Sequence, residues 1–127
     1  MRVRSERAFI LILNEARWEE KSRMSEQRVA PSCGRIDNFA TGKEEVVVAG
    51  GYYHGDLQSV EIYSVHNDLW RQGNPLPNKI GFASYLPFED SFIIIGGRNS
   101  SSTSLDTIYK VSSIVSFEIC HESDMLV

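Results

Sequence analysis

A unit of apolar strand, diglycine, polar loop and second strand occurs twice in this chain and restricts its fold more than any other feature. In the first copy, the apolar residues Val46, Val47 and Val48 precede Gly50-Gly51, and strand-forming residues follow at 57–63. In the second copy, Gly96-Gly97 lies 46 residues after the first diglycine. A repeat of roughly 50 residues with several short strands is typical of a propeller blade.

Both apolar runs predict strands that are covered on both faces. Residues 46–48 and 93–95 are consecutive β-branched residues, without the alternation of a strand that has one wet face. Stacked blades cover both faces, because each sheet of a propeller lies between its neighbours. The sequence therefore predicts an all-β fold of about two antiparallel four-stranded blades plus part of a third.

The first copy resembles the kelch repeat, whose pattern is a strand ending in GG, then L-x-S-V-E-x-Y, then a polar turn and Trp. The matching residues are Gly50, Gly51, Leu57, Ser59, Val60, Glu61, Tyr63, Asn67 and Trp70. In the second copy Gly96, Gly97, Leu105, Thr107 and Ile108 match, whereas Tyr109 replaces Glu61, Val111 replaces Tyr63, and Phe117 falls near the Trp position. The resemblance covers roughly residues 18–117 and implies an incomplete kelch-type β-propeller.

The repeat divides the chain into four predicted parts. These are residues 1–22 as the end of a preceding blade, 23–70 as kelch repeat 1, 71–117 as a repeat 2 that is degenerate at its end, and 118–127 as a tail without repeat character that is either frayed or not native to the fold. Residues 8–18 parallel the outer strands that end at Trp70, although a short amphipathic helix over residues 17–28 is the alternative. We predict the innermost strands at 30–33 and 82–85. We also predict that Trp18 and Trp70 pack between blades.

Composition and residue spacing argue against several classes of site. The net charge of −4 and a pI near 5.3 provide no basic field for nucleic acid. Cys33 and Cys120 have no ligand partner at short spacing, and His54, His66 and His121 are scattered, so that no metal or other cofactor is expected. No nucleophile elbow and no Gly-Lys-Ser/Thr sequence occurs, so we predict no catalytic residue.

The apolar runs of the sequence also bear on the compartment that we expect. No apolar run approaches the ~20 residues that a membrane helix needs, and no clear signal peptide is present. We therefore expect a cytoplasmic protein without membrane contact, or an extracellular one if a signal sequence is missing from the sequence given.

The loops that follow the two diglycines are the candidate binding residues. They leave successive blades at the same edge, and Tyr and Arg are frequent interface anchors. We predict partner binding by Tyr52, Tyr53, His54 and Arg98, and the alternative is that these are simply exposed loop residues.

The kelch resemblance implies a non-catalytic module for protein–protein interaction. It suggests a substrate-receptor part of a cullin-type ubiquitin ligase adaptor. The alternatives are a fragment of a kelch-like enzyme propeller of the copper-dependent sugar oxidase type, or a truncated product without independent function. Self-association through open blade edges is a further expectation.

Overall fold

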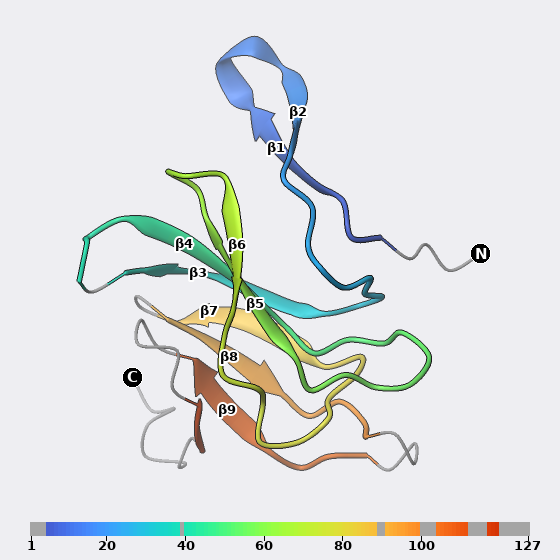
Figure 1. Cartoon of the computed structure of the whole chain (residues 1–127). Coiled ribbons are helices and arrows are strands. Elements are labelled where there is room, and N and C mark those ends of the chain that lie inside the picture. The colour runs from blue at the N-terminus through green and yellow to red at the C-terminus, as the bar shows by residue number, and fades with distance from the viewer. Residues whose placement is uncertain (1–4, 39, 89–90, 100–103, 112–116, 120–127) are drawn as a thin grey trace.

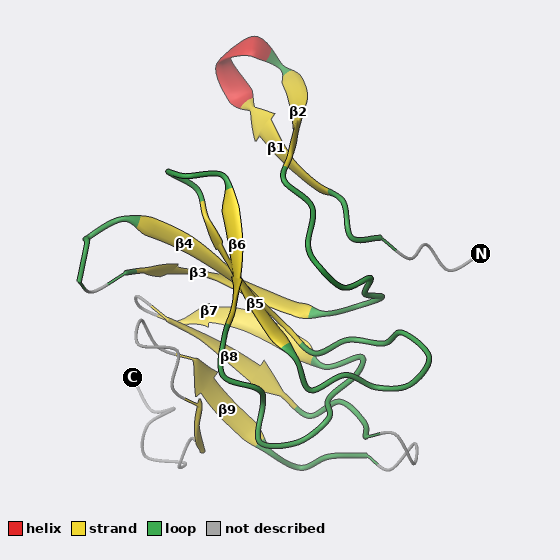
Figure 2. Cartoon of the chain, viewed as in Figure 1, coloured by secondary structure: helices red, strands yellow, loops and turns green. Residues whose placement is uncertain are grey.

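The computed structural model describes residues 5–38, 40–88, 91–99, 104–111 and 117–119, and within them the chain is all-β (Figures 1 and 2). No α-helix occurs among these residues, and a 3-10 turn at Leu13–Glu15 joins the first two strands. The strands are β1 (Ala8–Ile12), β2 (Arg17–Lys21), β3 (Ser32–Asp37), β4 (Glu44–Ala49), β5 (Val60–Ser64), β6 (Leu69–Gln72), β7 (Ser84–Phe88), β8 (Ser91–Ile95), β9 (Ile108–Val111) and β10 (Phe117–Ile119).

The strands form three antiparallel sheets in which strands that follow one another in sequence are neighbours. A two-stranded sheet, β1-β2, precedes the four-stranded sheets β3-β4-β5-β6 and β7-β8-β9-β10. The two four-stranded sheets lie against each other, with β3 next to β7 and β8 (Figure 1). This arrangement confirms the predicted fold class of partial kelch blades.

The core lies between the two four-stranded sheets, which explains the unbroken apolar runs. It contains Val47 and Ile62 from the first sheet and Phe92 and Ile94 from the second, all at most 2% exposed. Gly34 on β3 makes room for Phe92, since a Cβ at Gly34 would lie only 2.3 Å from the Phe92 ring. The shared apolar seam therefore depends on both blades.

Backbone hydrogen bonds repeat along the chain with an offset of 52 residues. Met24 N donates to Glu6 O as Leu76 N donates to Gln58 O, and Arg28 N donates to Ser5 O as Ile80 N donates to Leu57 O. In the same way, Leu11 pairs with Trp18 as Tyr63 pairs with Trp70. The β1–β2 hairpin is thus the outer half of a blade. The alternative of a helix over residues 17–28 is wrong, because β2 pairs along its whole length with β1.

The pairing registers of the two complete blades also agree. Val48 pairs with Glu61 as Ile94 pairs with Tyr109, and Val46 pairs with Tyr63 as Phe92 pairs with Val111. At the last position, Phe117 pairs with Val111 as Trp70 pairs with Tyr63. The second copy therefore has the same strand pairing as the first, although several of its side chains differ.

Several predicted strand limits are wrong by a few residues. The strand predicted at 57–63 begins only at Val60, because the backbone of residues 57–59 bonds instead to the diglycine and to the segment before β7. The innermost strands begin at Ser32 and Ser84, after Ala30 and Phe82, which have positive φ angles of 48° and 54°. At the C-terminus β10 extends to Ile119, and the rest of the predicted tail, residues 120–127, lies outside the described residues.

The prediction for the two tryptophans holds for neither in full. Trp18 is 67% exposed on the β1–β2 hairpin, so the prediction that it packs between blades is wrong. Trp70 is half-buried against Tyr63, with ring centroids 4.9 Å apart, and its Nε1 donates to Ser22 O at 2.7 Å. The two tryptophans differ because the segment that contains Ser22 lies over Trp70. None of the described residues covers Trp18 in the same way.

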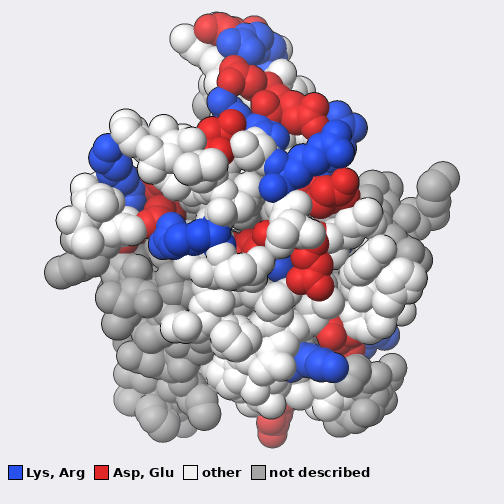
Figure 3. Space-filling view, in the orientation of Figure 1, with Lys and Arg blue, Asp and Glu red and all other residues white. Residues whose placement is uncertain are grey.

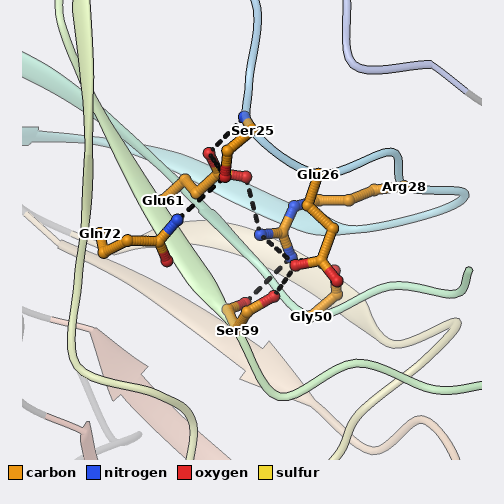
Figure 4. Close-up of polar contacts among 7 residues, drawn as sticks. All are labelled: Ser25, Glu26, Arg28, Gly50, Ser59, Glu61 and Gln72. Carbon is orange, nitrogen blue, oxygen red and sulfur yellow. Dashed lines mark hydrogen bonds and ion pairs between the residues drawn. The ribbon is translucent and has the colours of Figure 1, made fainter.

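A buried polar cluster attaches the segment before β3 to the first four-stranded sheet (Figure 4). Arg28 Nη2 lies 3.0 Å from Glu61 Oε2, and Arg28 Nη1 donates to Gly50 O and Ser59 O. Ser25 N and Oγ both donate to Glu61 Oε1 at 2.8 Å. Burial opposes ionisation of Glu61, but these hydrogen bonds outweigh it and leave the pKa of the carboxyl lowered.

Candidate partner-binding surface

The loops that follow the two diglycines begin with equivalent backbone conformations and hydrogen bonds. All four glycines have positive φ. Leu57 N donates to Gly51 O as Leu105 N donates to Gly97 O. One residue after each diglycine, the chain forms a paired bridge to the segment before the innermost strand: Tyr52 with Val29, and Arg98 with Gly81. Tyr52 and Arg98 therefore occupy equivalent positions in successive blades.

Arg98, Tyr52 and Phe82 form a contact across the two blades, which we call the aromatic–arginine cluster. The Arg98 guanidinium lies 4.5 Å from the centroid of Phe82 and 5.8 Å from that of Tyr52, while the two rings are 6.0 Å apart. These separations are within the range of cation–π attraction. Arg98 is 35% exposed at its side chain and Phe82 37% exposed, so the cluster reaches the surface.

Asp56 lies beneath the cluster and holds Arg98 electrostatically. Its Oδ1 is 3.7 Å from Arg98 Nε, and its side chain is only 3% exposed. Neither of these two buried atoms has a hydrogen bond in the described part of the chain. A Cβ at Gly81 would come within 2.1 Å of the same oxygen, so the carboxylate occupies the space that a side chain at position 81 would need.

Phe82 and Asp56 were not predicted as site residues. Phe82 was assigned to a strand, but its φ of 54° places it in the left-handed region, where a bulky residue is uncommon. Ala30 has the same conformation 52 residues earlier, so the repeat imposes this backbone and the aromatic ring is specific to the second blade. That alignment was the only sequence signal for Phe82. No sequence signal indicated the contact of Asp56 with Arg98, because these residues lie on two loops that are far apart in the sequence.

Tyr53 and His54 form a separate pair on the first loop. Their rings meet edge to face at 4.3 Å, and His54 is exposed with a φ of 55°. They line a cavity of about 340 Å³ together with Glu26, Asp56 and Lys79. The structure thus divides the four predicted binding residues into Tyr52 with Arg98 and Tyr53 with His54.

A larger cavity, of about 570 Å³, lies between the innermost strands β3 and β7. Cys33 and Tyr85 are among its lining residues, and a side-chain hydrogen bond with Cys33 raises the pKa of Tyr85. Cys33 is a free, half-buried thiol, whereas Cys120 and His121 lie outside the described residues.

The described residues provide neither a cluster of metal ligands nor a membrane-spanning helix. No group of three or more His, Cys, Asp or Glu side chains among them could hold a metal ion. None of the helices in the described part of the chain is long and apolar enough to cross a membrane.

Comparison with known protein families identifies the repeat. The kelch motif matches residues 39–77, which include β4, the first diglycine, β5 and β6. No curated protein matches the chain. The chain therefore contains a kelch motif at residues 39–77, and its two four-stranded sheets have the same strand order.

Proposed function

We propose that the chain is a non-catalytic protein-interaction module and that the aromatic–arginine cluster is the centre of its binding surface. The observation that carries this proposal is the position of Arg98, whose guanidinium lies over the ring of Tyr52 from the first complete blade and over the ring of Phe82 from the segment before β7. These three side chains come from segments that the backbone bridges Val29–Tyr52 and Gly81–Arg98 hold in place.

The residue types support this role. Tyr and Arg are enriched among the few residues that dominate binding energy at protein interfaces. Because Arg98 is already positioned by Phe82 and by Asp56, it loses less side-chain freedom on binding than a solvated arginine. A planar guanidinium also offers several donors to a partner's carboxylate or carbonyl groups.

The Tyr53–His54 pair would extend this surface along the first loop. Tyr53 and His54 line their cavity next to Lys79 and Glu26, which provide charges of both signs. In the setting that the kelch resemblance implies, a substrate receptor of a cullin-type ubiquitin ligase, this surface would contact the substrate.

The proposal can be tested with the whole 127-residue chain and a displayed library of natural peptides and small domains. Binders are selected against the wild-type chain, and their affinity is then measured for Arg98→Ala, Tyr52→Ala and Arg98→Lys. The matched control is Tyr85→Ala, which removes another exposed aromatic ring outside the cluster.

We expect Arg98→Ala to weaken the selected binders by at least about 2 kcal/mol, roughly thirtyfold, as for other interface hot spots. Arg98→Lys should weaken them as well, because lysine lacks the planar guanidinium. Tyr85→Ala should have little effect. If Tyr85→Ala abolished binding and the cluster variants did not, the binding surface would lie elsewhere.

A further inference from the structure

The cavity beside the Tyr53–His54 pair is lined by a carboxylate that lacks a hydrogen-bond donor. Asp56 lines this cavity of about 340 Å³, and its side chain is only 3% exposed. Its Oδ1 is buried and accepts no hydrogen bond from the described residues. The ion pair with Arg98 Nε, at 3.7 Å, is beyond hydrogen-bond distance. Because buried carboxylates are normally both paired and hydrogen-bonded, this acceptor indicates a place for a donor from outside the chain.

A second carboxylate reaches the same cavity from a different segment. Glu26 belongs to the segment before β3, and its side chain is 33% exposed. Its contacts with Ser59 Oγ and Arg28 Nη2 both use Oε2. Asp56 comes instead from the loop after the first diglycine. A ligand in the cavity can therefore meet two carboxylates that separate parts of the backbone hold in place.

The remaining lining residues fit a small cationic group. Tyr53 supplies an aromatic ring, and Gln58 and Ser59 supply neutral polar side chains. Lys79 is the one lysine or arginine that lines the cavity. With His54 neutral, the acidic side chains of the lining therefore outnumber the basic ones.

The ion pairs of the β1–β2 hairpin offer no comparable site. On the face shown in Figure 3, charged side chains gather over the hairpin and the segment next to it, and fewer lie over the rest of that face. The acids of the hairpin have basic partners, as in Arg7–Glu20 and Lys21–Glu19, at exposed or half-buried positions where solvent screens them. Asp56 differs from them because it combines burial with an acceptor that no donor fills.

We propose that this cavity binds a primary ammonium group, supplied by a lysine side chain of the protein partner. An ammonium is a compact charge with three donors, which suits carboxylates that come from separate segments. The Tyr53 ring adds cation–π attraction. The choice of a partner's lysine rests on the proposed function, because Asp56 borders both this cavity and the aromatic–arginine cluster.

Lys79 allows a test of the sign of the charge that the cavity binds. Its side chain is exposed and lines the same cavity, so its charge repels a bound ammonium. Lys79→Gln should therefore tighten the binding of an ammonium ligand by about two- to fivefold, as expected for a single exposed charge. A substitution at an exposed position of this kind should leave the fold intact.

The experiment titrates the 127-residue chain with Nα-acetyl-lysine methylamide and follows the backbone amide resonances by NMR. The matched probe is the same molecule acetylated at Nε, which keeps the alkyl chain and removes the charge. We expect the charged probe to shift the resonances of Glu26, Tyr53 and Asp56. It should bind at least about tenfold more tightly than the acetylated probe, because it donates charged hydrogen bonds.

Asp56→Asn and Glu26→Gln each keep the size of the side chain and remove one negative charge. Each should weaken the binding of the charged probe at least about fivefold. Asp37→Asn is the matched control and should have no effect, since Asp37 lines the other cavity, between β3 and β7. If Asp56→Asn does not fold, Glu26→Gln and Lys79→Gln still decide the result.

The effect of Arg98→Ala separates this inference from the proposed function. Removing Arg98 takes a cation away from Asp56, so the variant should bind the charged lysine probe more tightly. The proposed function instead requires Arg98→Ala to weaken the selected binders. Either result can therefore fail without the other.

Equal binding of the two lysine probes would overturn the proposal, as would a charged probe whose affinity Asp56→Asn and Glu26→Gln leave unchanged. Weaker binding to Lys79→Gln than to the wild type would also contradict it. A last titration uses n-butylamine, which has the side chain of lysine without the peptide backbone. Tighter binding of n-butylamine than of the lysine probe would assign the cavity to a free amine and overturn the choice of a partner's lysine.

Discussion

Arg28 and Glu61 form an ion pair that is almost completely removed from solvent, with Nη2 and Oε2 3.0 Å apart and side chains 0% and 1% exposed. The next blade solves the same packing problem without charge. There, Ile80 occupies the position of Arg28 and Tyr109 that of Glu61, and Asn78 Nδ2 donates to the Tyr109 hydroxyl at 2.8 Å. The same backbone arrangement thus accepts either an ionic or a largely apolar contact between the segment before the innermost strand and the four-stranded sheet that follows it.

This equivalence leads to a prediction about Arg28 and Glu61. Arg28→Ala or Glu61→Ala leaves the other charge buried without its partner, so each should lower the free energy of unfolding by about 3–5 kcal/mol. The double variant Arg28→Ile/Glu61→Tyr copies the second blade and should be more stable than either single alanine variant. Urea unfolding followed by tryptophan fluorescence would measure this, and a double variant that is the least stable of the three would contradict it.

The same carboxylate predicts a pH dependence. Burial disfavours the charged form of Glu61, but its hydrogen bonds from Ser25 and Arg28 lower its pKa below the usual 4.5 overall. A group with a lowered pKa stabilises the fold above its unfolded pKa, and this contribution disappears as the pH falls through the folded pKa. The stability difference between the wild type and Glu61→Gln should therefore be constant near neutral pH and shrink below about pH 4.5. Unfolding free energies measured at a series of pH values would test this, and a difference that grows on acidification would refute the assignment.

The first glycines of the two diglycines differ in a way that substitution can detect. Gly50 and Gly96 have the same φ of 65°. An added Cβ would meet Ile80 O at 2.4 Å at Gly50, but its nearest neighbour at Gly96 would be Leu105 O at 3.5 Å. Gly96→Ala should cost about 1–2 kcal/mol for the left-handed backbone, and Gly50→Ala at least about 1 kcal/mol more for the crowding. Equal losses of stability in chemical unfolding would show that crowding at Gly50 is relieved without cost.

The two tryptophans should respond unequally to truncation. Trp70 packs on Tyr63 and donates a hydrogen bond to Ser22 O, so Trp70→Ala should cost about 3 kcal/mol or more. Trp18→Ala in dilute solution should change stability by no more than about 0.5 kcal/mol, because the side chain is exposed. Thermal unfolding of both variants at low protein concentration would measure the difference, and similar losses would mean that Trp18 is covered in solution.

The blades could be predicted from the sequence because the signals for them lie in short, continuous segments of the chain. Consecutive apolar residues at 46–48 and 93–95 indicate strands covered on both faces, and the spacing of the diglycines sets the repeat. Trp18 was misjudged because the repeat position defines its place in the sheet but not what lies above it. The cluster of Tyr52, Phe82 and Arg98 was only partly predicted, since it depends on a left-handed backbone at Phe82 and on contacts between separate loops.

The shared left-handed conformation of Ala30 and Phe82 has a consequence for how such surfaces diversify. The scaffold sets the main chain at this position in both blades, while one blade carries a methyl group there and the other an aromatic ring. The side chain at this position can therefore change in size and chemistry without any change in the sheets beneath it, and the ring of Phe82 is an addition to a backbone that the repeat already provides.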